Sequence, residues 1–286
     1  MAGSTFWNPR SRAILVAVIL SGATLAAAPK PGAEKASKVA DNYNIPLWEE
    51  SKVPMAKGAG PLDSPFVTVF LPPEGKRNGA SVVIAPGGSN IMLMYGGEGI
   101  DIAERYNDWG VAAFVLTYRM APAYDEAARV ADGKRAIQLV RSRASQFKLD
   151  PTKVGYIGFS AGSNMGRSVV AESGPGDPSS PDPLERLSSR PDYLGLVYGP
   201  GRATKSEVLK NFPPTFLVAA QDDRGPSTGS AQLFIELTRA GAVAELHLYQ
   251  KGRHGFGGGY GSPEFGGWMA DLERFLKVGG FLPGAK

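Results

Sequence analysis

The chain of 286 residues contains no cysteine and only two histidines, His247 and His254. The absence of cysteine excludes disulfides, thiolate zinc sites and a cysteine nucleophile. Two histidines are also too few for a zinc site built on several histidines. Any chemistry that needs a histidine must therefore use one of these two residues.

The chain also lacks a strong excess of one charge. It has 31 lysines and arginines against 27 aspartates and glutamates, and the basic residues are scattered. This distribution argues against a nucleic-acid partner. Hydrophobic residues make up 43% and charged residues 20% of the chain, which is typical of a globular protein with one large domain or two small ones.

Residues 1–28 have the three parts of a secretory signal peptide. Arg10 and Arg12 precede an apolar run over residues 13–25, and three alanines follow. The run of about 13 residues is shorter than the roughly 20 that a membrane span needs. We expect export to a bacterial periplasm or medium, with no stable membrane association after cleavage. An uncleaved anchor is the alternative. Residues 29–60 are predicted to be a linker and residues 61–286 the catalytic domain.

From residue 66 onward, apolar runs alternate with helical patterns. Runs such as 216–220 are apolar throughout, which is typical of strands buried on both faces. The alternation predicts an α/β fold with a mostly parallel sheet and helices on both faces. The expected strands are 66–71, 81–85, 112–118, 154–159, 193–198, 215–220 and 245–249. The expected helices are 99–109, 124–145, 161–172, 230–240 and 264–277.

The motif G-x-S-x-G occurs twice, around Ser160 and around Ser227. In a nucleophile elbow, the serine occupies a sharp turn between a strand and a helix, and the residues two positions away must be small. Ser160 has this context, with a strand predicted before it and a helix after it. Ser227 follows a polar stretch and is predicted to lie near the start of a helix. The alternative for Ser160 is a tight turn with an inert serine.

A serine nucleophile needs a base, and the base needs a carboxylate partner. His254 lies in a glycine-rich loop after a predicted strand, whereas His247 lies inside that strand, where a structural role is expected. Asp222 and Asp223 follow the strand 215–220. We predict Asp222 as the partner because it is closer to the strand end, with Asp223 capping the next helix or bracing the loop. The order Ser160, Asp222, His254 is that of α/β-hydrolases.

Acyl transfer also needs donors for the developing oxyanion. Gly87 and Gly88 follow the strand 81–85, and glycines let backbone N–H groups approach a substrate closely. The predicted donors are the N–H groups of Gly88 and of Ala161, the residue after the nucleophile. A plain turn is the alternative for the two glycines.

Taken together, these motifs resemble the bacterial acetyl-xylan-esterase-like and feruloyl-esterase-like (dienelactone-hydrolase-like) enzymes of the α/β-hydrolase superfamily. The resemblance runs from about residue 62 to 281 and includes the segments 86–88, 98–99, 118–119, 158–162, 182–192, 213–216, 245–249 and 252–257. It implies hydrolysis of short-chain carboxylic esters, either small molecules or acylated plant polysaccharides. It implies no metal or organic cofactor.

The sequence departs from this family beside the predicted site. Ser89 and Asn90 stand where relatives have a third glycine and an aromatic residue. Only 14 residues separate Tyr198 from Pro213, which predicts a short or absent lid and an open site. Ser89, Met92 and Tyr95 are predicted to contact the substrate, with ordinary packing as the alternative for the last two. A peptidase and an inactive carbohydrate-binding protein are the competing functions.

Overall fold

The computed structural model describes residues 43–199, 206–260, 262 and 264–284. The predicted signal peptide, residues 1–28, and the first part of the predicted linker lie outside these ranges. The segment between Tyr198 and Pro213, where a short or absent lid was predicted, lies partly outside them as well. No helix in the described part of the chain is long and apolar enough to cross a membrane.

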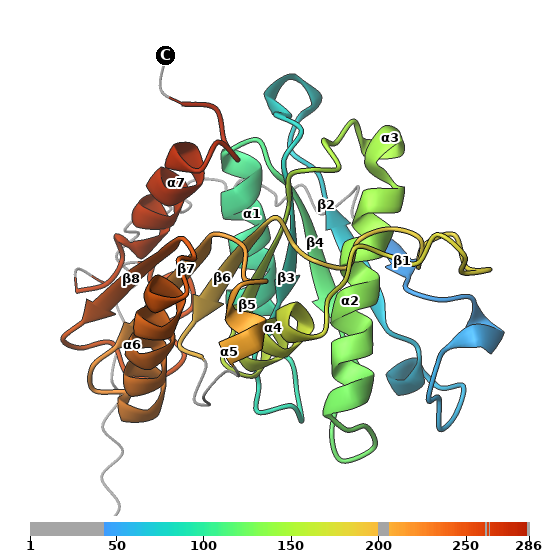
Figure 1. Ribbon diagram of the computed structural model, residues 1–286, viewed down its shortest axis with the longest axis horizontal. Helices are drawn as coiled ribbons and strands as arrows, with labels where there is room; N and C mark the ends of the chain where they lie inside the picture. Colours follow the sequence, from blue (N-terminus) through green and yellow to red (C-terminus); the bar gives the residue numbers. More distant parts are fainter. Residues whose placement is uncertain (1–42, 200–205, 261, 263, 285–286) are drawn as a thin grey trace, which may run out of the picture. The chain divides into compact units, whose positions relative to one another are not determined.

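Within the described residues, eight strands form one sheet in the order β1-β2-β4-β3-β5-β6-β7-β8 (Figure 1). β2 pairs antiparallel with β1 and β4, and the remaining pairs are parallel. This confirms the predicted α/β fold with a mostly parallel sheet. The strands are β1 (Asn44–Pro46), β2 (Phe66–Phe70), β3 (Ser81–Ala85), β4 (Ala112–Thr117), β5 (Val154–Phe159), β6 (Tyr193–Val197), β7 (Thr215–Ala220) and β8 (Ala244–Tyr249).

All seven predicted strands are present, each within one residue of its predicted ends. β3, β5, β6 and β7 are buried along their whole length, as their continuous apolar runs indicated. The sequence reading missed β1, which has only three residues, one of them a proline. Proline is tolerated on an edge strand because it has no N–H to donate. β1 lies in the predicted linker, and Leu47 beside it is buried.

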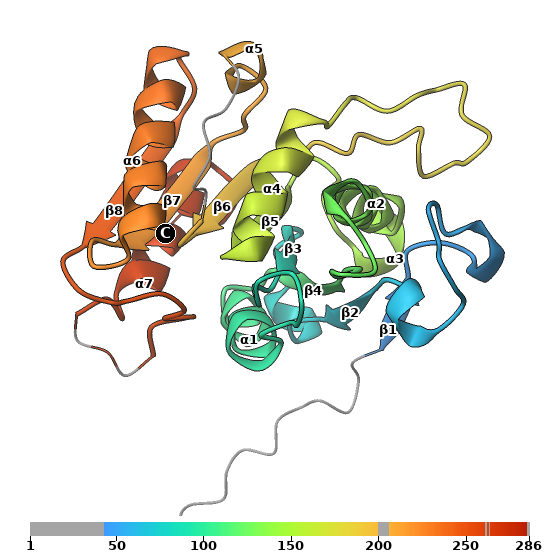
Figure 2. The same ribbon diagram turned by 90° about the horizontal axis from the view of Figure 1, so that it is seen from below.

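Helices cover both faces of the sheet and create two separate cores. The helices α2, α4 and α6 lie on one face, and α1 and α7 lie on the other (Figure 2). The buried side chains of each group belong to a separate core. The α-helices are α1 (Asp101–Asp108), α2 (Glu126–Ser142), α3 (Ala144–Phe147), α4 (Ala161–Ala171), α5 (Ser206–Leu209), α6 (Arg224–Arg239) and α7 (Trp268–Val278). The short turns are the 3-10 helices η2 (Glu50–Lys52), η3 (Pro61–Asp63) and η4 (Glu74–Lys76) and the π-helical turn η5 (Gly96–Ile100).

Two helices begin four or more residues away from their predicted starts, for identifiable reasons. α6 begins at Arg224 rather than at residue 230, so Gly225 and Pro226 lie in its first turn. Proline is tolerated there because the first N–H groups of a helix have no intrahelical acceptor. The prediction that Ser227 lies near a helix start is confirmed. α7 begins at Trp268, four residues after the predicted start at 264, since residues 264–267 form a turn.

A buried ion pair attaches the N-terminal residues to the sheet and α2. Arg119, at the end of β4, lies 2.7 Å from Asp132 of α2, and both side chains have 0% exposure. The Arg119 guanidinium also donates to the carbonyl of Pro54 and lies 5.4 Å from the ring of Trp48. Burial raises the pKa of Asp132, against the opposing effect of Arg119. The pair therefore organises three segments that are distant in sequence.

Replacing one partner of this pair should strongly destabilise the fold. Asp132→Asn keeps the side-chain volume but leaves the Arg119 charge buried without a counterion, so the free energy of unfolding should fall by about 3–5 kcal/mol. Urea denaturation measures this loss. The control is Glu74→Gln, which removes an exposed ion pair with Lys148 and should leave the urea midpoint unchanged. Equal midpoints for both variants would contradict the prediction.

Candidate active site

Ser160 occupies the sharp turn between β5 and α4, where the elbow was predicted. Its backbone has φ 50° and ψ −111°, in the left-handed half of conformational space that residues other than glycine rarely adopt. Such strain persists only where the surrounding structure enforces it, and it is concentrated at functional sites. The turn therefore has the backbone form of a nucleophile elbow.

The two glycines of the motif are required by close packing. A Cβ atom on Gly158 would lie 2.2 Å from the carbonyl oxygen of Gly162, and one on Gly162 would lie 2.1 Å from that of Ala85. Both distances are far below van der Waals contact, so neither position accepts a side chain. The first glycine of the second motif has no such constraint, because a Cβ atom on Gly225 would meet nothing within 4 Å.

Hydrogen bonds connect Ser160 through His254 to an aspartate. Ser160 Oγ lies 2.7 Å from Nε2 of His254, and His254 Nδ1 lies 2.6 Å from Oδ2 of Asp223. A carboxylate can only accept, so Nδ1 carries the ring proton and Nε2 is left to accept from the serine hydroxyl. These residues follow β5, β8 and β7, whose carboxyl ends share one edge of the sheet.

The aspartate that contacts His254 is Asp223, which corrects the prediction of Asp222. Asp222 accepts instead from the backbone N–H groups of Arg253 (2.9 Å) and Gly252 (3.4 Å). The chain turns directly after β7, with the N–H of Asp223 donating to the carbonyl of Ala220. In this turn the two carboxylates have different partners: Asp223 meets the imidazole and Asp222 braces the loop. The predicted roles of the two residues are therefore exchanged.

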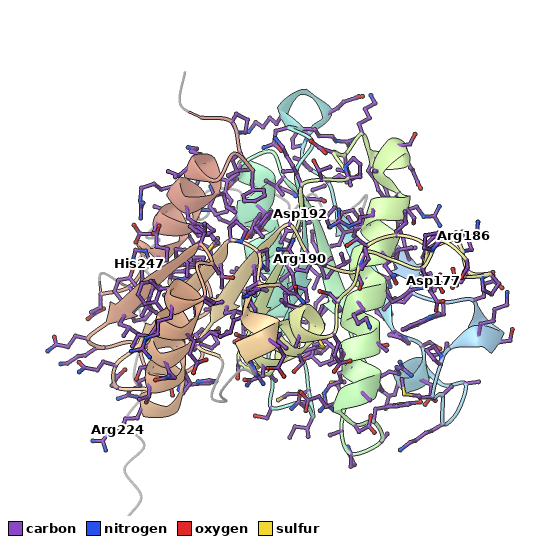
Figure 3. The ribbon with its side chains drawn as sticks, viewed as in Figure 1. Asp177, Arg186, Arg190, Asp192, Arg224 and His247 are labelled. Carbon is purple, nitrogen blue, oxygen red and sulfur yellow. The ribbon has the colours of Figure 1, made fainter. Side chains whose placement is uncertain are left out.

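His247 has a different environment, on the outer strand β8 (Figure 3). It lies 2.7 Å from Glu245 and stacks on the ring of Phe216. These contacts fit the structural role that its position within a strand indicated.

Two backbone N–H groups are available beside Ser160. Ala161 is the first residue of α4, and such N–H groups have no acceptor within the helix. Among the described residues, neither Ala161 nor Gly88 donates its N–H to a protein acceptor. Gly87, by contrast, donates to Glu98 Oε2 at 2.6 Å. The positive φ values of Gly88, Ser89 and Asn90 shape this turn. The geometry thus leaves Gly88 and Ala161, the predicted pair, able to bind an oxyanion.

The predicted substrate contacts divide into exposed and buried side chains. Ser89 and Met92 are exposed on the turn that follows β3, where a substrate can reach them. Tyr95 is half-buried, donates its hydroxyl to Thr68 and packs against the core beside α1 and α7. This arrangement favours the packing alternative for Tyr95.

A polar pocket with a volume of about 290 Å³ lies next to Ala161. It is lined by Asn90, Glu126, Arg129, Ala161, Asn164, Met165 and Arg167. No group of three or more His, Cys, Asp or Glu side chains within the described residues could hold a metal ion.

Sequence reasoning overlooked two buried groups beside the site, Glu98 and Tyr198. Glu98 is 5% exposed, and Tyr198 donates its hydroxyl to Glu98 Oε1 at 2.7 Å. Glu98 had entered only as part of the family resemblance. The sequence around Glu98 does not indicate that this carboxylate is buried. Its partners, Gly87 and Tyr198, lie about 10 and 100 residues away in the chain.

Comparison with known proteins agrees with the fold. Residues 67–173 match the BD-FAE family model. The crystal structure of an acetyl ester-xyloside bifunctional hydrolase from Caldicellulosiruptor lactoaceticus superimposes with a TM-score of 0.76 at 29% identity, over 84% of this chain and 97% of that one. The chain has the α/β-hydrolase fold. The predicted fold is thereby confirmed.

Two curated proteins are similar to this chain over most of its length. An acetylxylan esterase from Xylanibacter ruminicola is 29% identical in an alignment of 233 residues that covers 73% of this chain and 45% of that protein. Endo-1,4-beta-xylanase B from Butyrivibrio fibrisolvens is 24% identical in an alignment of 241 residues that covers 73% of this chain and 37% of that protein. The chain thus spans less than half the length of either relative.

Exchanging each aspartate for its isosteric amide separates their roles. Asp223→Asn should slow the labelling of Ser160 by a fluorophosphonate on the order of 10³- to 10⁴-fold, because the amide favours the wrong imidazole tautomer. Asp222→Asn keeps an oxygen that accepts from the loop, so labelling should slow by about tenfold at most. Intact-protein mass spectrometry follows both reactions. A larger effect at Asp222 would restore the original prediction.

Proposed function

We propose that the protein is a serine esterase that removes short acyl groups, above all acetyl groups, from sugar hydroxyls of polysaccharides. The observation that carries the proposal is the hydrogen-bonded series Asp223–His254–Ser160, which ends at a strained serine. The relatives named as an acetylxylan esterase and an acetyl ester-xyloside hydrolase agree with a carboxylic ester hydrolase.

In the proposed reaction, His254 takes the proton of Ser160 while Oγ attacks the ester carbonyl. The negative charge that develops on the carbonyl oxygen is stabilised by the N–H groups of Gly88 and Ala161. Asp223 holds the imidazole in the reactive tautomer and stabilises the imidazolium. His254 then gives the proton to the departing alcohol, and a water molecule releases the acid by the same steps in reverse.

The surroundings of Ser160 suit a polar alcohol. The pocket beside Ala161 presents asparagine, arginine and glutamate side chains, which can form hydrogen bonds with sugar hydroxyls. The His254 side chain is 47% exposed, so a bulky substrate can reach the nucleophile from solvent. An acetyl group needs less apolar space than a larger acyl group such as feruloyl. These features support the acylated sugar of a polysaccharide as the substrate.

The same proposal places the enzyme outside the cytoplasm. Polysaccharide esters are extracellular polymers, and residues 1–28 carry the pattern of a secretory signal. The finer choice between acetyl and feruloyl groups rests on the acyl side of the site, where Met92 is exposed.

A serine exchange tests the proposal directly. Ser160→Ala should lower kcat for p-nitrophenyl acetate on the order of 10⁵- to 10⁶-fold, as expected for loss of a nucleophile. The matched control is Ser227→Ala in the second G-x-S-x-G motif, which should keep full activity. The wild type should hydrolyse the acetate faster than the butyrate and octanoate, and should release acetate from acetylated xylan.

Wild-type protein that hydrolyses none of these esters would contradict the proposed function. Preferential release of ferulate from feruloylated arabinoxylan would support an esterase, but with feruloyl rather than acetyl as the preferred acyl group. Faster cleavage of aminoacyl amides would instead favour the peptidase.

A further inference from the structure

Glu98 is a buried carboxylate that the triad does not use. It lies on the π-helical turn η5 and is 5% exposed. Within the described residues, no lysine or arginine pairs with it. Burying a carboxylate without a cation is costly unless hydrogen bonds compensate. Its two oxygens accept separate bonds, one from the N–H of Gly87 and one from the hydroxyl of Tyr198.

The bond from Gly87 determines which N–H groups of the oxyanion turn remain available. Glu98 accepts from the N–H of Gly87 at 2.6 Å, whereas no protein acceptor for the N–H of Gly88 is found among the described residues. The packing is tight, since a Cβ atom on Gly87 would lie 2.8 Å from Cβ of Ser160 and 2.9 Å from Oε2 of Glu98. Glu98 therefore holds the oxyanion turn directly against the nucleophile.

The hydrogen bond from Tyr198 connects the same carboxylate to the loop that contains His254. The Tyr198 hydroxyl donates to Glu98 and accepts from the N–H of Gly257, at 2.7 and 3.1 Å. Its ring meets the imidazole of His254 edge-on, with centroids 5.0 Å apart. Burial raises the pKa of Tyr198, so its hydroxyl stays protonated and able to donate. Tyr198 thus contacts both the imidazole of His254 and the loop that follows it.

We propose that Glu98 and Tyr198 are positioning residues that tie the oxyanion turn to the histidine loop, so that the oxyanion donors and the general base keep one fixed spacing around Ser160. The inference rests on the proposed function and adds a role for side chains that touch no reacting atom. A misplacement of about 1 Å in such a site can cost about 100-fold in rate.

Glu98→Gln removes one of the two hydrogen-bond acceptors of this side chain and leaves its shape almost unchanged. A carboxylate accepts from both donors, whereas the amide has one acceptor oxygen and one NH₂ group. With the oxygen facing Gly87, the NH₂ group faces the Tyr198 hydroxyl, which then loses its acceptor. We expect kcat for p-nitrophenyl acetate to fall by about 10- to 100-fold with KM within about twofold, because positioning acts in the transition state.

A double-variant cycle tests whether the two residues act as one unit. Tyr198→Phe should also lower kcat, and Glu98→Gln combined with Tyr198→Phe should cost about as much as the larger single change. Tyr193→Phe is the matched control, because this buried tyrosine also donates its hydroxyl, to the Ser81 carbonyl, but lies outside the network. It should leave kcat unchanged.

Thermal unfolding and fluorophosphonate labelling keep the result interpretable. In labelling, Ser160 Oγ forms a bond to phosphorus, fluoride leaves and His254 takes the proton, so the rate reports the assembled site without any ester. Glu98→Gln should unfold at a temperature close to that of Tyr193→Phe, yet label more slowly by the same factor as its loss in kcat.

Different outcomes would contradict the positioning role, the coupling of the two residues and the proposed function. A folded Glu98→Gln variant with wild-type kcat and labelling rate would overturn the positioning role and leave the esterase proposal standing. Losses that multiply in the double variant would overturn the coupling of the two residues. Wild-type protein that neither labels at Ser160 nor hydrolyses esters would overturn the proposed function, and the positioning role with it.

Discussion

The close packing at the turn after β5 is the constraint on which the site depends. Gly158 and Gly162 lie so near to each other and to the carbonyl of Ala85 that neither position has room for a Cβ atom. This packing holds Ser160 at a positive φ and raises its hydroxyl above the carboxyl edge of the sheet. A serine in relaxed backbone geometry would not meet the imidazole in this way.

The rest of the site is assembled from loops that follow other strands. The parallel sheet brings the ends of β3, β5, β7 and β8 to one edge, so residues far apart in sequence converge there. Loops alone are mobile, and a catalytic arrangement must be held within about 0.5 Å. The backbone bonds to Asp222 on one side and the Glu98–Tyr198 pair on the other provide this support.

Some elements could be read from the sequence because a local pattern specified them. The buried strands and the elbow belong to this class, since apolar runs indicate burial and a G-x-S-x-G motif between a predicted strand and a predicted helix indicates a tight turn. Other features were missed because their signal is not local. β1 is stable only by pairing with β2, and Glu98 is buried only because Gly87 and Tyr198 surround it. The same holds for Asp222 and Asp223, since their order along the chain does not indicate which of them contacts His254.

The sequence by itself determined the α/β class, the nucleophile candidate Ser160 and the choice of His254 over His247, because strand–turn–helix context and loop position are written along the chain. Only the tertiary structure decided which aspartate meets the histidine and that the buried Glu98 accepts from Gly87 and Tyr198. Those outcomes depend on the direction of side chains after a turn and on partners as distant as Tyr198. Direction and distant partners follow from packing in three dimensions, which spacing along the chain does not encode.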